Sequence, residues 1–569
     1  MSAQSQASFA DVIEAHVADL RRRQSATRPA VVPDEVRYPY GERTLPEYVS
    51  HWAAVSPDKP AVVCAGETTT YAALDDRVRR AAGGLRALGV SAGDRVAVDL
   101  PNSTEFVVTM LAALRLGAVH VPVNPMFTPE ELAYELTDSG AAVLVTFPAL
   151  LPAVRSVRAA TPLEHVVVVP LGAGQADPDG PGGGESAWGD LVVHAPITDC
   201  ATDLDALAAL NYTGGTTGFP KGCQHTQRHM LYTAAAAATS IGLGAEDEFS
   251  ALCYLPIFWI AGEDLGILLP VVLGGTSVLM ARWDAGTALR LLAEHRVRTM
   301  CGTVENYLEI LDRDDLADHD LSALIDPNAV SFVRKMDPEV RRRWRDRVGS
   351  HSLLREASYG LTETNTLDTS PWGLAEGDRD LLEEPVFCGV PVPGTDIVVV
   401  DWETGLPVSV GESGEILVRS PAVTTGYWNN PEATAEQLVD GWLHTGDNGR
   451  LDEAGCLHYL GRRKEMIKVK GMSVFPAEIE MALGRHPAVG SVAVVPAAHP
   501  DKGEQPVAFV TLVGRGVDAA TLEAYAAEHL SRYKVPVVVV VDDFPMTTTG
   551  KIRKVELEQL AQEAVDART

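Results

Sequence analysis

The sequence lacks the usual marks of a secreted, membrane-spanning or zinc-bound protein. Its seven cysteines are odd in number and far apart, and none belongs to a C-x-x-C pair, so neither a disulfide framework nor a zinc site is expected. No run of about twenty apolar residues is present, so we expect no membrane span. The first residues lack a basic start followed by an apolar core, which argues against a secretory signal. We therefore expect a cytoplasmic protein with reduced thiols.

Positive charge is scarce as well. The 569 residues include 47 Lys and Arg against 77 Asp and Glu, a formal net charge of -30. A nucleic-acid binder needs a basic face for the phosphates, so this balance argues against nucleic acid as a partner. With 46% apolar and 22% charged residues, the composition is ordinary for a globular enzyme with more than one core. Any anionic ligand must therefore be held by local basic clusters.

The order of the sequence patterns predicts an α/β fold. Between residues 60 and 145, short Val- and Ala-rich runs alternate with helical patterns, as is typical of parallel sheets with right-handed crossovers. Residues 386–430 are β-like. We predict a large N-terminal domain of doubly wound mixed sheets with a β subdomain, followed by a small mobile α+β C-terminal domain. The predicted boundaries are a partly frayed N-terminal leader at 1–40, the large domain at 41–461 and the small domain at 462–569.

A glycine-rich stretch, YTGGTTGFPKG at 212–222, follows the helix-like run LDALAAL. Glycines let the backbone approach a ligand closely, threonines supply hydroxyls and the lysine supplies a mobile positive charge, so the stretch is suited to a polyphosphate. It is not a Walker A sequence, because Gly222 and not Ser or Thr follows Lys221. Composition alone leaves an ordinary glycine-rich turn open, and other segments must decide.

The loop resembles the phosphate-binding signature of the class I adenylate-forming enzymes, the superfamily of acyl-CoA synthetases, luciferases and peptide-synthetase adenylation domains. That pattern reads Thr-Ser/Gly-Gly-Thr/Ser-Thr-Gly-x-Pro-Lys-Gly, and this chain matches every position. Four further stretches match in order: SYGLTET, GWLHTGDNG, GRRKEMIKVKG and PMTTTGKIRK. The resemblance implies that the loop residues bind ATP or AMP; these are Thr213, Gly214, Gly215, Thr216, Thr217, Gly218 and Lys221.

The stretch SYGLTET, at 358–364, resembles the adenine and magnesium segment of the family. The resemblance implies that Tyr359, followed by Gly360, lies against the adenine. It also implies that Thr362 bonds a phosphate oxygen and that Glu363 ligates Mg2+. This assignment is chemically reasonable, because Mg2+ is usually bound by one or two carboxylates together with phosphate oxygens.

Three later segments complete the resemblance. It implies that Asp447 accepts hydrogen bonds from the ribose hydroxyls and that Arg462 contacts the ribose and phosphate. Lys464 stands at the family's hinge position. Lys551, in a Thr- and Gly-rich loop near the C-terminus, is the lysine expected to bridge the substrate carboxylate and the α-phosphate.

The implied reaction has two halves. A carboxylate attacks the α-phosphorus of ATP and expels pyrophosphate, and the thiol of coenzyme A then displaces AMP. The small domain is expected to turn about Lys464, which withdraws Lys551 and brings Gly471 to a pantetheine tunnel. Lys468 either belongs to a basic strip beside the CoA phosphates or is an ordinary solvated charge. The alternative enzyme loads the acyl group onto a carrier protein's phosphopantetheine. An acyl carrier protein as partner and a homodimer both stay open.

Departures from the family pattern bear on the acid. In LPIFWIAGED, Trp259 stands where many acyl- and aryl-CoA synthetases carry histidine and amino-acid adenylation domains carry aspartate. Tryptophan cannot hold an α-ammonium, so we expect an apolar acid, fatty or aromatic, with Trp259 as a gate, a wall or only a packing residue. In VSFVRKMDPE, Val333 is expected in the substrate pocket, while Arg334 and Lys335 point either at a polar group of the acid or outward. Glu305, in GTVENYLEIL, stands where many members of the family have proline, and the sequence gives no reason for this difference.

Overall fold

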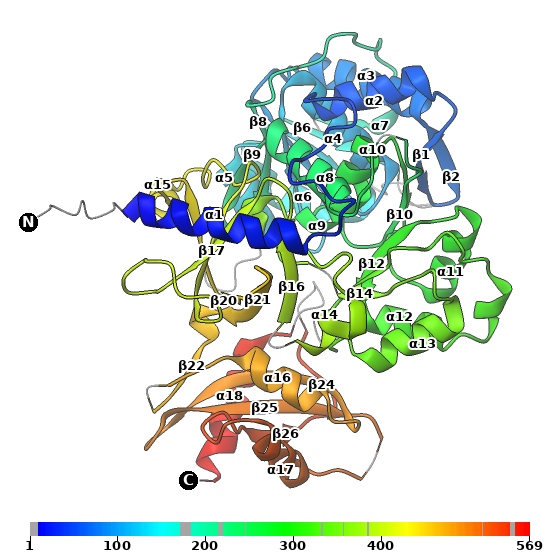
Figure 1. The fold of residues 1–569 in the computed structure, drawn as a ribbon. Coiled ribbons are helices and arrows are strands. Elements are labelled where there is room, and N and C mark those ends of the chain that lie inside the picture. The colour runs from blue at the N-terminus through cyan, green and yellow to red at the C-terminus, as the bar shows by residue number, and fades with distance from the viewer. Residues whose placement is uncertain are drawn as a thin grey trace, which may run out of the picture.

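The computed structural model describes most of the chain, and its sheets and helices are drawn in Figure 1. The described residues are 9–170, 184–213, 220–244, 246–331, 334–356, 358–383, 386–470, 472–514, 516–546 and 552–568. Within them the strands form four sheets. No helix in these ranges is both long and apolar enough to cross a membrane.

The first two sheets are mainly parallel. One has the order β14-β13-β12-β10-β11-β1-β2 and is antiparallel only at β1–β2. Its strands are β1 (Pro60–Cys64), β2 (Glu67–Thr70), β10 (Ser250–Cys253), β11 (Thr276–Leu279), β12 (Thr299–Thr303), β13 (Asn328–Val330) and β14 (Arg355–Glu356). The other has the order β7-β6-β5-β3-β4-β8-β9 and is antiparallel only at the β8–β9 hairpin. Its strands are β3 (Arg95–Val98), β4 (Val119–Pro122), β5 (Val143–Thr146), β6 (His165–Val168), β7 (Glu185–Ala187), β8 (Leu207–Tyr212) and β9 (Gly222–Thr226).

Helices alternate with these strands, which confirms the doubly wound prediction. They are α2 (Leu45–Val55), α3 (Tyr71–Ala87), α4 (Thr104–Leu116), α5 (Pro129–Ser139), α6 (Leu151–Val157), α7 (Trp188–Val192), α8 (Gln227–Ser240), α9 (Ile260–Glu263), α10 (Leu269–Leu273), α11 (Ala285–Glu294), α12 (Val304–Leu311), α13 (Pro338–Val348) and α14 (Arg379–Leu382). Buried residues of α3, α4 and α8 form one core with residues of both sheets. α4 shows typical ends, because Ser103 Oγ accepts from Phe106 N and Gly117 closes the helix at φ 72. The shared helices thus hold the two sheets together.

The third sheet is antiparallel and forms the predicted β subdomain. It has the order β15-β16-β21-β20-β18-β17, and β19 pairs with β20. Its elements, with the neighbouring helix, are β15 (Thr369–Ser370), β16 (Val386–Pro391), β17 (Asp396–Val400), β18 (Ser413–Arg419), α15 (Pro431–Gln437), β19 (Leu438–Val439), β20 (Trp442–Leu451) and β21 (Leu457–Arg462).

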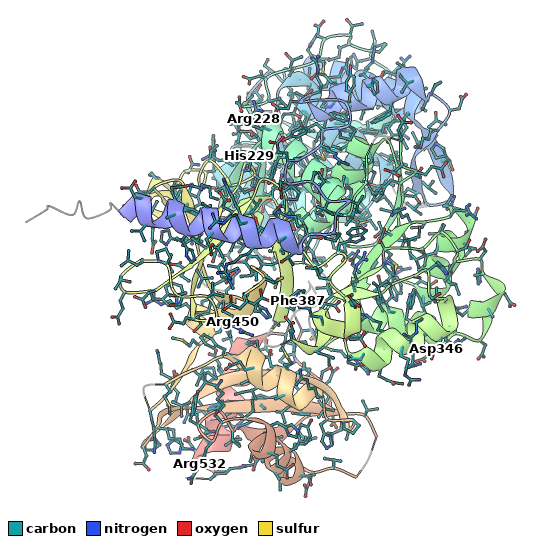
Figure 2. The ribbon with its side chains drawn as sticks, in the orientation of Figure 1. Arg228, His229, Asp346, Phe387, Arg450 and Arg532 are labelled. Carbon is teal, nitrogen blue, oxygen red and sulfur yellow. The ribbon has the colours of Figure 1, made fainter. Side chains whose placement is uncertain are left out.

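The last sheet carries its own helices and is the small α+β unit. A 3-10 turn at Arg463–Glu465 leads into it from β21. Its elements are β22 (Ile467–Val469), β23 (Met472–Val474), α16 (Pro476–Gly484), β24 (Val489–His499), β25 (Gly503–Leu512), α17 (Ala519–His529), β26 (Val537–Val540) and α18 (Lys554–Asp566). Figure 2 places Arg532 on the side of this unit that is remote from Phe387 of β16.

Two local expectations are wrong. The run LDALAAL is not helical, because most of it belongs to β8, whose Ala208, Ala209 and Leu210 are buried between other elements. The N-terminal segment is not frayed over residues 9–27. These form α1 (Phe9–Thr27), whose Ile13, Val17 and Leu20 pack into the core of the β subdomain.

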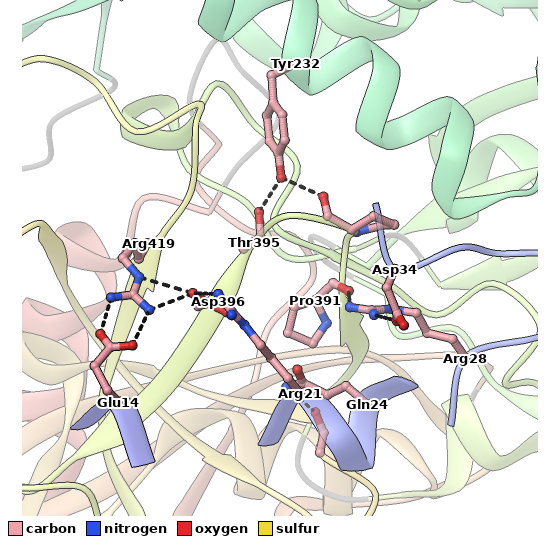
Figure 3. A network of polar contacts seen from close by, with 12 residues as sticks. Glu14, Arg21, Gln24, Arg28, Asp34, Tyr232, Pro391, Thr395, Asp396 and Arg419 are labelled. Carbon is pink, nitrogen blue, oxygen red and sulfur yellow. Dashed lines mark hydrogen bonds and ion pairs between the residues drawn. The ribbon is translucent and has the colours of Figure 1, made fainter. Parts of the chain in front are cut away.

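Polar contacts hold α1 in the same place (Figure 3). The Arg21 guanidinium donates to both oxygens of the buried Asp396 carboxylate at 2.7 Å. Arg419 of β18 donates to Asp396 Oδ2 at 2.9 Å and also to Glu14. Because α1 buries an apolar stripe and closes a charge network, it is a structural part of the large domain.

Candidate functional site

A cleft of about 2740 Å³ is lined by residues from all four sheets and their loops. The predicted site residues that line it are Thr213, Lys221, Trp259, Gly360, Thr362, Glu363, Arg462, Lys464 and Lys468. The predicted residues that lie outside the described part of the chain are Gly214, Gly215, Thr216, Thr217, Gly218, Val333, Gly471 and Lys551. One cleft therefore gathers segments that are hundreds of residues apart in the sequence.

Lys221 is held at the base of the β8–β9 hairpin. Thr213 N donates to Lys221 O at 3.0 Å, and Lys221 N donates to Thr213 Oγ1 at 3.2 Å. These two bonds close the glycine-rich segment at its ends. The Lys221 ammonium lies 4.1 Å from the ring centroid of Tyr427, a cation–π distance. The ring thus places the ammonium beside the cleft.

Glu363 lies on a 3-10 turn, Thr362–Thr364, that is tied to neighbouring segments. Thr424 N donates to Glu363 O at 2.7 Å. His225 Nε2 lies 2.8 Å from Thr362 O, and burial lowers the pKa of His225 to about 3, so the neutral ring donates through Nε2. The backbone around Glu363 is therefore fixed from both sides.

Tyr427 is a site residue to which the sequence analysis assigned no role. Its hydroxyl donates to Glu363 Oε1 at 2.7 Å and is also in contact with Gln437 Oε1, while its ring lies under the Lys221 ammonium. Backbone pairing with Cys223 of β9 holds it there. Its contacts with Glu363 and Lys221 cross 64 and 206 residues of sequence, so they leave no local signal in the sequence. One side chain thus joins the loop lysine to the candidate magnesium ligand.

Asp447 is buried beside the cleft with its acceptors only partly used. The Tyr359 hydroxyl donates to Asp447 Oδ2 at 2.7 Å, and Arg462 Nε lies 3.4 Å from Oδ1. Oδ1 has no hydrogen-bond donor among the described residues. Burial raises the pKa of Asp447 to about 6, although Arg462 and the Tyr359 bond oppose this shift.

Gly360, next to Tyr359, is required by close packing of the backbone. A Cβ on Gly360 would lie 1.3 Å from Thr366 O, so only glycine fits there.

The part of the cleft lining that comes from residues 237–269 is mainly apolar and includes Trp259; we call it the wall around Trp259. Trp259 precedes α9 and meets Phe258 edge to face at 5.6 Å. The other lining residues of this wall are Ala237, Ile241, Phe249, Leu255, Ile260, Leu265 and Leu269. Asp264 lies among them and is only 8% exposed. This part of the cleft is suited to an apolar group.

Glu305 anchors the backbone at Arg334, within the stretch VSFVRKMDPE. Glu305 Oε1 accepts from Arg334 N at 3.1 Å, which supplies a reason for a glutamate at this position. The cleft lining includes Lys335 but not Arg334. Lys335 Nζ donates to Ser331 O at 3.3 Å. Of the two cations, only Lys335 lines the cleft.

The C-terminal unit meets the cleft at the start of α18. Ile552, Arg553 and Lys554 line the cleft. Lys554 Nζ lies 3.3 Å from Glu465 Oε2 in the connecting turn and 3.4 Å from Glu480 Oε1 of α16. The start of α18 is therefore held next to the connecting turn that follows Arg462.

The sequence matches two family models. The model described as AMP-binding enzyme matches residues 49–428, and the AMP-binding enzyme C-terminal domain matches residues 478–551. The 4-coumarate–CoA ligase 5 of Oryza sativa subsp. japonica is 34% identical over 524 residues, which cover 90% of this chain and 94% of that protein. A long-chain-fatty-acid–CoA ligase of Salmonella typhimurium strain LT2 is 32% identical over 563 residues, which cover 95% of this chain and 98% of that protein.

A solved structure agrees with these sequence matches. The crystal structure of an anthranilate CoA ligase in complex with anthranoyl-AMP has a TM-score of 0.78 and 26% identity, and the match covers 92% of this chain and 98% of that chain. Sequence and fold thus agree over nearly the whole chain. The chain belongs to the AMP-binding enzyme family, and it is an AMP-forming acid–CoA ligase that uses ATP, Mg2+ and coenzyme A.

Proposed function

We propose that the protein activates an apolar carboxylic acid, fatty or aromatic, as its acyl adenylate and then transfers the acyl group to coenzyme A. One observation carries this proposal. Lys221, Glu363 and the Tyr359–Asp447 pair line or adjoin the same cleft as the apolar wall around Trp259. Polar groups suited to a nucleotide and an apolar surface suited to an acyl group therefore belong to the same cleft.

Adenylation overcomes the poor reactivity of a carboxylate, whose charge repels nucleophiles and whose oxide is a very poor leaving group. In the first half-reaction the acid attacks the α-phosphorus of ATP and pyrophosphate leaves. Little covalent chemistry falls to the protein, so its residues must position the reactants and neutralise charge. We assign that task to Lys221, to Thr362 and to Lys551.

Glu363 is the residue we assign to Mg2+. Tyr427 is its one hydrogen-bond donor among the described residues, so the carboxylate keeps acceptor capacity for a hard cation. When bound, Mg2+ would supply positive charge to the phosphate oxygens. Tyr427 would keep the carboxylate aimed at that position.

Asp447 is the proposed ribose ligand. Its Oδ1 is buried without a donor, which suits a hydroxyl that arrives with the nucleotide. Arg462, across the strand pair from Asp447, is placed to meet the ribose and phosphate. The proposed stacking of adenine on Tyr359 uses the ring, because its hydroxyl is already bonded to Asp447.

For the second half-reaction we propose that the unit at 462–569 turns about Lys464 relative to the unit at 41–461. Lys464 lies in the 3-10 turn between β21 and β22, and no residue of that turn is buried. An exposed turn between two folded units can absorb a change of backbone angles. Gly471 would then face the pantetheine, and Lys468 remains a candidate for the CoA phosphates.

The class of acid follows from the wall around Trp259. Its lining is aliphatic and aromatic apart from Asp264 and Ser240. One relative is named for 4-coumarate and another for long-chain fatty acids, so the names of the relatives include both an aromatic and a fatty acid. Both relatives are named for CoA, and neither name refers to a carrier protein.

The direct test incubates the protein with ATP, Mg2+ and a panel of fatty and aromatic acids, with and without coenzyme A. We expect AMP, pyrophosphate and acyl-CoA, identified by mass. Glu363→Gln should lose turnover with every acid, whereas Glu339→Gln, on the exposed face of α13, should behave as the wild type. Formation of ADP would overturn the proposal. Acyl-AMP that reacts with a phosphopantetheinyl carrier but not with CoA would favour the alternative enzyme.

A further inference from the structure

Asp264 begins a π-helical turn within the wall around Trp259. The helix that starts with α9 continues through residues Asp264–Leu268 as a π-helix before α10 begins. Leu269 N donates to Asp264 O, five residues back. Such turns are rare, and they are frequent at functional sites.

Pro270 supplies a reason for the irregular turn. Proline has no N–H, so it cannot donate to Gly266 O four residues back. Ser277 Oγ of β11 donates to Gly266 O instead, at 2.6 Å. The neighbouring strand thus satisfies the carbonyl that Pro270 leaves free, and the widened turn keeps Asp264 in the lining of the cleft.

The Asp264 carboxyl has no partner in these surroundings. Oδ1 is fully enclosed and receives no hydrogen bond from the described residues. The neighbouring lining residues Trp259, Ile260 and Leu265 are apolar. Burial alone raises the pKa of Asp264 to about 7, as expected for a carboxyl that has lost water and gained no donor. Such a group destabilises the folded protein until a donor reaches it.

The residues beside Asp264 add further unused acceptors. Glu263 is fully buried; its Oε2 accepts from Asn211 Nδ2 at 3.2 Å, while Oε1 has no donor among the described residues. Asn211 lines the cleft and its Oδ1 also lacks a donor there. His120 lies 4.0 Å from Glu263, and burial lowers its pKa to about 3, so it supplies no positive charge. Burial raises the pKa of Glu263 to about 8, so this carboxyl carries its own proton at neutral pH, and Glu263 does not line the cleft. Asp264 is therefore the carboxyl here to which a ligand in the cleft can supply a donor.

We propose that Asp264 recognises a hydrogen-bond donor on the acid, so that the substrate is an otherwise apolar carboxylic acid carrying a hydroxyl or amino group. This inference rests on the proposed function and narrows its substrate class. A plain hydrocarbon chain would leave Asp264 without a partner. A site built around a buried acceptor discriminates strongly against the analogue that lacks the donor.

The test compares matched acids in an ATP–pyrophosphate exchange assay. The probes are 4-hydroxy-, 4-amino- and 4-methylcinnamate, and 16-hydroxyhexadecanoate against hexadecanoate. In the wild type we expect kcat/KM to favour the hydroxyl or amino form by about tenfold or more within the preferred skeleton. The hydroxyl and amino arms distinguish the two kinds of donor.

Variants then assign the preference to Asp264. Asp264→Leu should remove it by lowering kcat/KM for the donor-bearing acid and raising it for the methyl or unsubstituted acid, with KM for ATP unchanged. If the leucine variant does not fold, Asp264→Asn, which has nearly the same shape, takes its place. It should lower the ratio of kcat/KM for the donor-bearing acid to kcat/KM for the donor-free acid. The control is Asp99→Asn, because Asp99 is also a buried carboxyl with an unpartnered Oδ1 and a pKa raised to about 7, but it does not line the cleft.

The outcomes separate the two proposals. Equal activation of donor-bearing and donor-free acids by the wild type, or an unchanged ratio in Asp264→Asn, would overturn the role of Asp264 and leave the ligase function standing. Absence of pyrophosphate exchange with every acid of the panel and of a wider set would instead defeat the proposed function.

Discussion

We distinguish a proposed nucleotide side of the cleft, with Lys221, Glu363 and Asp447, from a proposed acyl side, with Trp259 and Asp264. The carboxyl groups of the two sides differ in their hydrogen-bond partners. On the nucleotide side Glu363 receives the Tyr427 hydroxyl and Asp447 receives the Tyr359 hydroxyl. On the proposed acyl side Asp264 receives no hydrogen bond from the described residues, although it is only 8% exposed. Each carboxyl of the proposed nucleotide side is thus held by a tyrosine before ATP arrives, although Asp447 Oδ1 stays open for the nucleotide, whereas Asp264 has no such anchor and depends on the acid alone in our proposal.

This difference follows the chemistry of the two ligands. Every acid meets the same triphosphate, so groups that act on it gain from fixed positions and need no rearrangement during the reaction. A wall that must select one acid gains from a group left unsatisfied until the right acid supplies its donor. Mutations on the nucleotide side should therefore affect all acids equally, and mutations on the acyl side should change their ranking.

The largest effect is expected for Lys551→Ala. Loss of a preorganised charge donor should slow adenylation by about a hundred- to a thousand-fold. The factor should be equal for fatty and aromatic acids, as measured by pyrophosphate exchange. Reaction of preformed acyl adenylate with CoA should largely survive. Equal loss of both half-reactions would contradict the assignment of Lys551 to adenylation alone.

Tyr427→Phe should come next. The substitution keeps the ring under Lys221 and removes the hydroxyl that donates to Glu363 Oε1. A hydrogen bond to a charged group contributes about 1.5–3 kcal/mol, so kcat of adenylation should fall about 10- to 100-fold with every acid. The Mg2+ concentration for half-maximal rate should rise as well.

Tyr307→Phe is the matched control for that experiment. Tyr307 is also a buried tyrosine, but its hydroxyl donates to the main chain at Met300 O and Asn328 O and the residue does not line the cleft. This variant should lose thermal stability and keep its Mg2+ dependence. A similar Mg2+ shift in both variants would show that Tyr427 acts only through general stability.

A pH dependence of nucleotide binding should follow from Asp447. In its proposed role the ionised carboxylate accepts hydrogen bonds from the ribose hydroxyls. Its pKa is raised to about 6 by burial, with Arg462, Tyr359, Glu363 and Glu465 as the ionisable neighbours. The carboxylate is therefore mostly present at pH 7 and mostly lost at pH 5. KM for ATP should rise about tenfold over this range for every acid, and Asp447→Asn should flatten the profile. A flat wild-type profile would contradict this role of Asp447.

The sequence predicted features that depend on local pattern. The alternation of strands and helices and the β subdomain both follow from periodicity and breaker residues. The failures are also instructive. The alanines of LDALAAL suit a helix by propensity, but tertiary packing places them in β8. In contrast, the spacing of Ile13, Val17 and Leu20 already carried the helical signal that a leader interpretation ignored.

The candidate site divides in the same way. Residues such as Lys221 and Glu363 stand in short motifs, so a resemblance can find them from sequence alone. Tyr427 and Asp264 become visible only in the fold. The first acts through partners far away in the chain, and the second is notable for having no partner, which no sequence pattern records. Asn211 and Glu263, 52 residues apart, meet for the same reason.

The smallest effect is expected for Ser277→Ala, which tests the support of the acyl side. The lost hydroxyl leaves Gly266 O without its donor and lets the π-helical turn relax, which should lower the melting temperature by about 1–3 °C. Up to roughly 1 kcal/mol of the lost hydrogen-bond energy should weaken binding of the acid, which increases KM for the preferred acid about two- to fivefold. KM for ATP should not change. The control is Thr276→Val in the same strand, since Thr276 Oγ1 donates to Pro60 O, away from the turn. If both variants alter KM for the acid alike, the effect comes from a general disturbance of β11 and not from the bond between Ser277 Oγ and Gly266 O.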